Sequence, residues 1–171
     1  MSGLVLNEDV KWITFSSNYD FAYLLKTLTS AALPLDENSF FDLLYTFFPC
    51  LFDVKYMVVQ IESLKYSGLS SSGEQLKIDR VGIMHQAGSD SLLTLQCYFG
   101  VIKKFMNGIC DEKRFVRELY GLGNNMTRNF SKQYMTMGGG GATGPYGDIS
   151  GSSSVLQYAP NVHFPNQHHG Y

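Results

Sequence analysis

The sequence predicts an α/β fold, and the order of its local patterns carries this prediction. Residues 10–15 (VKWITF) form a short segment rich in β-forming residues, which is typical of a strand. Apolar residues at helical spacing follow it, and a second segment with the composition of a buried strand begins at Leu51. Further helical patterns come after that segment. Strand and helix patterns that alternate in this way indicate an α/β protein.

The two helices expected between these strands each have a start or a stop signal. Residues 16–18 (SSN) supply turn and capping chemistry, so the first helix is expected to begin near Tyr19. Its apolar face consists of Phe21, Leu24, Leu25 and Leu28. Asp36 or Asn38 can cap the second helix, and Pro49 stops it.

The pattern is less regular after the second strand, which is expected to run directly into a helix. Glycine and serine residues at 64–73 predict a loop, and residues 74–78 a short helix. Ser89 or Asp90 is expected to open a long helix with two apolar stripes, which predicts burial on both sides. The stripes are Leu92, Leu95, Phe99, Ile102 and Met106, and Leu93, Cys97, Val101 and Phe105. Residues 115–122 are expected to form a last helix that ends at glycines.

Composition excludes several classes of protein. The chain has 171 residues, a net charge of −2 and 16% charged residues, so a broad basic surface for nucleic acid is not expected. Its apolar runs are too short to cross a membrane, and its first residues do not resemble a secretory signal. The three cysteines have no paired spacing, which predicts free thiols in a reducing compartment.

The composition changes near residue 124 and predicts two regions. Residues 1–123 are expected to form the folded domain. Residues 124–171 hold 8 of the 17 glycines and only three charged residues, which predicts a disordered Gly/Ser-rich C-terminal tail. His163, His168 and His169 lie in this tail; a flexible polar end explains them better than a metal-binding tract.

Two acids and one histidine are the candidate functional residues. Asp20 follows the first strand, and the ends of strands in α/β sheets are common ligand sites. Taken alone, it is better explained as an acid that complements a helix dipole. His85 precedes Asp90 across a glycine turn; this pair is either a loop histidine beside a helix cap, or a proton-transferring histidine beside a metal-binding acid. Asp53, within an apolar segment, is interpreted as structural, paired with Lys55 or with backbone N–H groups.

The segment HQAGSDSLLT, residues 85–94, resembles the third exonuclease motif of the Caf/Pop deadenylases, which are the catalytic nuclease subunits of the Ccr–Not complex. Other segments resemble the same family in the same order: LVLNEDVKWITF, YDFAYLLKTLT, FFDLLYTFFP, FDVKYM and LYGLG. The resemblance covers about residues 3–123.

The resemblance implies a partial RNase H-like fold of the DEDD exonuclease class, with poly(A)-specific 3′–5′ exoribonuclease activity. Two divalent ions, Mg²⁺ or Mn²⁺, are expected in the complete family site. Asp20 and Asp90 match the acids of the second and third motifs, so both are expected to be catalytic metal ligands. His85 matches the histidine that positions or deprotonates the attacking water. The implied partners are poly(A) RNA, the Ccr–Not scaffold and companion deadenylase subunits, with no membrane. The implied location is the nucleus and the cytoplasm, including cytoplasmic mRNA-decay bodies.

The sequence also departs from the family pattern. The first family motif is an Asp-x-Glu pair, and the chain contains no Asp-x-Glu. The chain is therefore interpreted as N-terminally truncated and is expected to be inactive alone, with exposed apolar faces where the missing half would pack. Two alternatives remain: a non-catalytic copy that binds Ccr–Not partners or RNA, and a product with no function.

Overall fold

A computed structural model of the chain describes residues 3–123. The predicted disordered tail at 124–171, with its three histidines, lies outside the described residues. Strands and helices alternate along the first half of the described chain, as expected for an α/β protein. In chain order the elements are β1 (Lys11–Thr14), α1 (Asn18–Thr29), α2 (Glu37–Phe47), β2 (Cys50–Asp53), α3 (Val54–Val58), α4 (Leu69–Leu76), α5 (Ala87–Phe105) and α6 (Glu112–Phe115).

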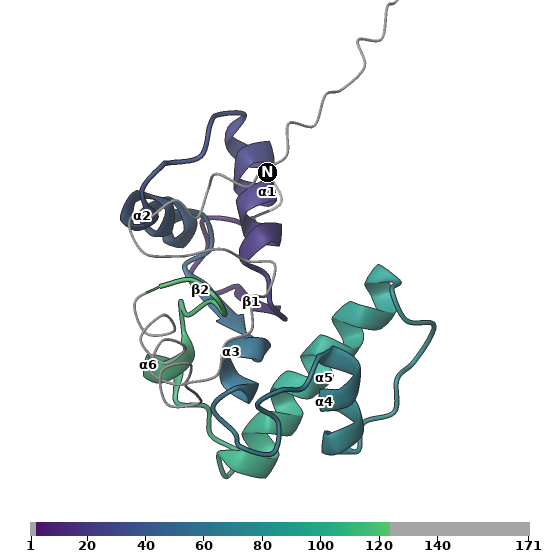
Figure 1. The fold of residues 1–171 in the computed structure, drawn as a ribbon. Coiled ribbons are helices and arrows are strands. Elements are labelled where there is room, and N and C mark those ends of the chain that lie inside the picture. Colours follow the sequence, from purple (N-terminus) through teal and green to yellow (C-terminus); the bar gives the residue numbers. More distant parts are fainter. Residues whose placement is uncertain (1–2, 124–171) are drawn as a thin grey trace, which may run out of the picture.

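The two strands form a parallel pair, with Lys11 opposite Cys50 and Thr14 opposite Asp53. Helices α1 and α2 make the crossover between them, which is the connection that parallel strands require. Helices α1 and α2 lie at one end of the molecule, whereas α4 and α5 pack side by side at the other (Figure 1). Both strands run almost directly into a helix, so the carboxyl edge of the sheet faces two helix starts.

The strand β2 separates two apolar cores. Side chains of a strand alternate between its two faces, and Leu51 and Phe52 point to opposite cores. The Leu51 core is closed by helices α1 and α2, with Phe21, Leu25, Phe40, Leu44, Phe48 and Leu119. The Phe52 core is closed by α3 and α5, with Val54, Met57, Val58, Leu93, Cys97 and Val101 among its members. The start of α1 is therefore fixed against one core and the start of α5 against the other.

Asp53 ties the carboxyl end of β2 to three other segments. Its carboxylate is 1% exposed and accepts four backbone N–H groups, two of them close: Ser16 at 2.7 Å and Lys55 at 2.9 Å. Tyr120 donates at 3.1 Å and Ser17 at 3.4 Å. Because buried acids need such partners, Asp53 is structural, and the prediction of backbone pairing is confirmed.

The predicted loop at 64–73 is too long and the predicted short helix at 74–78 starts too late, because α4 begins at Leu69 and runs to Leu76. Serine and glycine are weak helix formers, but here the helix packs against α5 and this contact outweighs local preference. Gly73 faces α5 so closely that a Cβ there would lie 2.9 Å from Leu93 Cδ1. The residue that predicted a loop is the one that lets the two helices approach.

Two predictions at the end of the described chain also need correction. Helix α5 begins at Ala87, so Asp90 lies in its first turn and is not its cap. Residues 115–122 do not form a helix; within residues 3–123 the last helix is α6, which ends at Phe115. The chain beyond it runs beside β2 instead, where Val116 bridges Phe52 and the Arg117 N–H donates to the Leu51 carbonyl at 2.9 Å.

Burial of α5 on both sides is wrong for the residues that the structure describes. Leu93, Cys97 and Val101 are buried, as expected for one stripe. Leu92, Leu95 and Phe99 of the other stripe are 40%, 41% and 59% exposed.

Replacing Gly73 with valine should lower the free energy of unfolding by about 2 kcal/mol, because the branched side chain would push α5 away at Leu93. Gly88 is the matched control: it also lies in a helix, but a Cβ there meets no atom within 4 Å. Urea denaturation of Gly73→Val and Gly88→Val measures the difference. Equal effects of the two substitutions would contradict the close α4–α5 contact.

Candidate active site

One cavity of about 830 Å³ contains all three candidate residues in its lining. It lies where the end of β1 and the first turns of α1, α4 and α5 meet. Asp20, His85 and Asp90 line it together with Arg80, although Asp20 is far from the others in the sequence. The short connection from β1 to α1 and the loop before α5 bring these polar residues to the same cavity, at the carboxyl edge of the sheet.

Asp20 lies in the first turn of α1, shortly after the end of β1. It is exposed, and its carboxylate accepts no hydrogen bond from any other described residue. The helix dipole favours a negative charge in the first turn, so the carboxylate of Asp20 is stabilised at this position. The same position leaves both carboxylate oxygens open to a ligand in the cavity.

His85 lies in the loop that leads into α5 and has a left-handed backbone conformation, with φ of 63°. This conformation costs a residue with a Cβ about 1 kcal/mol or more. Within residues 3–123 the imidazole has no hydrogen-bond partner. His85 lines the cavity, and an imidazole is a group that can accept or donate a proton.

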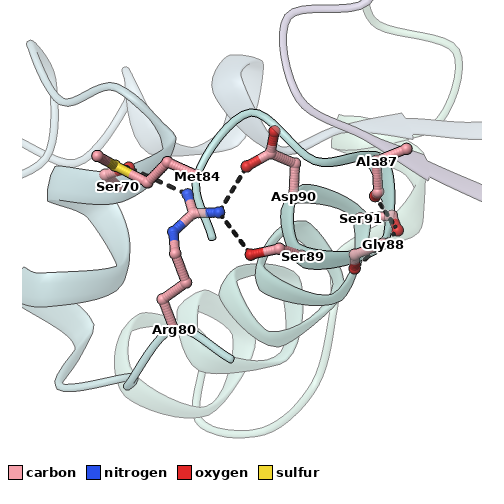
Figure 2. A network of polar contacts seen from close by, with 8 residues as sticks. All are labelled: Ser70, Arg80, Met84, Ala87, Gly88, Ser89, Asp90 and Ser91. Atoms are coloured by element: carbon pink, nitrogen blue, oxygen red, sulfur yellow. Dashed lines mark hydrogen bonds and ion pairs between the residues drawn. The ribbon is translucent and has the colours of Figure 1, made fainter. Parts of the chain in front are cut away.

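Asp90 lies in the first turn of α5 and is held by Arg80 (Figure 2). Arg80 Nη1 is 2.5 Å from Asp90 Oδ1 and 2.9 Å from Ser89 Oγ. Its second terminal nitrogen, Nη2, donates to Ser70 Oγ in α4 at 3.0 Å. A single guanidinium therefore links the first turns of α4 and α5 across the edge of the cavity.

Arg80 is the functional residue that sequence reasoning missed. It is a lone basic residue in an irregular segment, and nothing in its immediate sequence indicates its three partners. Those partners become visible only when α4, which the sequence pattern did not predict correctly, is placed beside α5. The Arg80 side chain is 16% exposed and that of Asp90 36%, so the pair is partly shielded from solvent.

The donor chemistry of the cavity suits a hard divalent cation, because two carboxylates face it. The described residues, however, contain no group of three or more His, Cys, Asp or Glu side chains placed to hold a metal ion. Asp20 and Asp90 are therefore not part of such a group within the described residues, and one Asp90 oxygen has a cationic partner, Arg80. In the same residues, no helix is long and apolar enough to cross a membrane.

The amino-acid sequence is similar to those of known proteins. No family model matches the chain. It is 44% identical over 123 residues to the poly(A) ribonuclease pop2 of Schizosaccharomyces pombe, a match that covers 72% of this chain and 36% of that protein. It is 46% identical over 122 residues to the probable CCR4-associated factor 1 homolog 7 of Arabidopsis thaliana, covering 71% and 43%. The chain is homologous to Pop2/CAF1 proteins over 71–72% of its length.

Solved structures agree with this assignment. The chain superposes on S. pombe Pop2p in its Mg²⁺- and Mn²⁺-bound form with a TM-score of 0.66 and 44% identity, covering 71% of this chain and 47% of Pop2p. It also matches yeast CAF1 co-crystallised with the NOT1 MIF4G domain, with a TM-score of 0.59 and 25% identity, covering 70% and 49%. The predicted partial RNase fold is confirmed. The chain spans less than half the length of these Pop2/CAF1 relatives.

Proposed function

We propose that the chain carries part of the active site of a poly(A)-specific 3′–5′ exoribonuclease, which shortens the poly(A) tail of mRNA. One observation supports this most strongly. Asp20, His85 and Asp90 line a single cavity in a chain homologous to Pop2/CAF1 proteins. Phosphodiester hydrolysis of this class needs carboxylates to hold divalent ions and a group to handle the proton of the attacking water.

In this proposal Asp20 and Asp90 are ligands of Mg²⁺ or Mn²⁺, the two ions bound in the S. pombe Pop2p structure. A bound ion supplies Lewis-acid stabilisation of charge at the phosphate oxygens and lowers the pKa of a coordinated water. His85 positions that water or accepts its proton, since it lines the cavity and its imidazole has no hydrogen-bond partner in the described chain. The remaining ligands of a complete site come from outside the described residues.

The partners follow from the family in the same way. We propose poly(A) RNA as the substrate, and the Ccr–Not scaffold and companion deadenylase subunits as protein partners. The support is that yeast CAF1 has been crystallised with a domain of NOT1, and that this chain matches CAF1 over 70% of its length. The nucleus and cytoplasmic mRNA-decay bodies are the proposed location, because mRNA deadenylation takes place there.

A non-catalytic role is the second candidate. Asp20 and Asp90 line the cavity, but the described residues contain no group of three or more His, Cys, Asp or Glu side chains placed to hold a metal ion. The exposed stripe at Leu92, Leu95 and Phe99 offers apolar surface for contact with another protein. A chain of this kind would bind Ccr–Not partners or RNA without hydrolysing it.

A chimera separates the two candidates. Residues 3–123 replace the matching segment of S. pombe Pop2, and the product is incubated with 5′-labelled oligo(A) and Mg²⁺ or Mn²⁺. We expect stepwise shortening, and we expect Asp20→Ala or Asp90→Ala to slow it by about 10³-fold or more, because the metal ligands act as a unit. Asp42→Ala, which removes an exposed acid of α2, is the matched control. A folded chimera without activity would contradict the catalytic role.

A further inference from the structure

We propose that Arg80 is an internal counter-ion that competes with the divalent cation for Asp90. Its guanidinium holds one oxygen of the carboxylate in the absence of metal and leaves that oxygen when the ion binds. Arg80 would then set the affinity of the site for metal. This inference rests on the proposed role of Asp90 as a metal ligand.

The geometry of the pair supports exchange rather than a permanent structural contact. Arg80 Nη1 contacts Asp90 Oδ1 at 2.5 Å, and within the described residues the other carboxylate oxygen accepts no hydrogen bond. The pair lies at the wall of the cavity that Asp20 and His85 also line. An ion entering that cavity can therefore reach Asp90 through its free oxygen before Arg80 leaves.

The surroundings of Arg80 provide it with a place to remain after the exchange. The same guanidinium donates to Ser89 Oγ at 2.9 Å and to Ser70 Oγ at 3.0 Å (Figure 2). Ser70 is itself anchored, because its hydroxyl also contacts Met84 Sδ at 3.5 Å. Ser91 takes no part, since its hydroxyl donates to carbonyls of its own helix. Loss of the Asp90 contact alone leaves Arg80 with two hydroxyl partners, so its release from the carboxylate does not strand a buried charge.

Electrostatics gives the sign of the effect. A positive charge next to a carboxylate stabilises it without metal and repels an approaching divalent cation. Removing that charge should strengthen metal binding, although it also removes an ordering contact. A purely structural Arg80 would give the opposite result, because a misplaced Asp90 binds metal less tightly.

The test is Mn²⁺ binding to the full chain, followed by the electron paramagnetic resonance of the free ion at fixed ionic strength. We expect Arg80→Gln to lower the Kd for Mn²⁺ by about tenfold, as expected for loss of one adjacent charge. Arg80→Lys keeps the charge and should stay close to the unmodified chain. Arg114→Gln removes the same charge from α6, away from the cavity, and should have no effect. Circular dichroism checks the fold of each variant.

Ser70→Ala and Ser89→Ala give a second, milder route to the same readout. Each removes one hydroxyl that would hold Arg80 after it leaves Asp90, so each should raise the Kd for Mn²⁺, which gives a second readout if Arg80→Gln does not fold. An unchanged or higher Kd in Arg80→Gln, or an unchanged or lower Kd in both serine variants, overturns the competition.

Failure of the proposed function has a different signature. If Asp20→Asn and Asp90→Asn leave Mn²⁺ binding unchanged, the ion is held elsewhere and the metal site itself is wrong, whatever Arg80 does. If no variant binds Mn²⁺, both the metal site in this chain and the competition are overturned.

Discussion

The isolated 171-residue chain should leave 5′-labelled oligo(A) intact in Mg²⁺ or Mn²⁺, under conditions in which S. pombe Pop2 shortens it completely. Asp20, Asp90 and His85 line the cavity, but the described residues contain no group of three or more His, Cys, Asp or Glu side chains placed to hold a metal ion. A two-metal site works as a unit, so a chain that holds only part of it should be slower than the complete enzyme by about 10⁴-fold or more.

The isolated chain and the chimera with S. pombe Pop2 should differ in activity. The isolated chain should be inactive, whereas the chimera that completes its site should be active. Shortening by the isolated chain that needs metal and disappears in Asp90→Ala would contradict the incomplete site. Shortening that survives Asp90→Ala would instead indicate a contaminating nuclease.

Asp53 should give the largest loss of stability among the polar residues of the fold. Its buried carboxylate satisfies four backbone N–H groups, from Ser16, Ser17, Lys55 and Tyr120. Asp53→Ala leaves these donors without their acceptor and opens a cavity at the carboxyl end of β2. We expect a loss of about 3–5 kcal/mol in the free energy of unfolding, measured by urea denaturation. Asp42→Ala serves as the exposed control. A loss below about 1 kcal/mol for Asp53→Ala would contradict the proposal that its four backbone hydrogen bonds stabilise the fold.

The pH dependence of Asp53 has a defined sign. Burial raises the pKa of Asp53 above its ordinary 3.8, and the backbone N–H donors oppose this shift without cancelling it. The native state therefore binds a proton more tightly than the unfolded state does. The stability contributed by protonation is fully present below pH 3.8 and is lost as the pH rises through the native-state pKa. The stability of the unmodified chain relative to Asp53→Asn should accordingly decrease as the pH rises above 3.8.

Local signals were enough for the elements whose boundaries depend on neighbouring residues. The strand at residues 10–15 and the helix after it were predicted, and Asp36 caps α2 by accepting the Ser39 N–H at 2.9 Å. The first half of helix α4 was missed, because its glycine and serine residues are helical only against α5. The segment after Phe115 was missed for the same reason, since it pairs with β2, which is far away in the sequence.

The candidate site shows the same division. The motif around His85 and Asp90 and the strand-end position of Asp20 indicated the three residues that line the cavity. The Arg80 pair was not predictable, because its geometry depends on Ser70 of α4 as well as on the start of α5. Sequence patterns identify residues by type and spacing, but a long side chain that links two helices is identified only by their packing.

We propose that Asp20 and Asp90 share one divalent-ion site in the cavity that both residues line. The most direct test is paramagnetic broadening of the amide NMR signals of the isotopically labelled chain by substoichiometric Mn²⁺. We expect the signals of Asp20, His85 and Asp90 to broaden together at the lowest Mn²⁺ concentrations, before those of the rest of residues 3–123. Broadening confined to the neighbourhood of His163, His168 and His169, with Asp20 and Asp90 unaffected, would contradict the account.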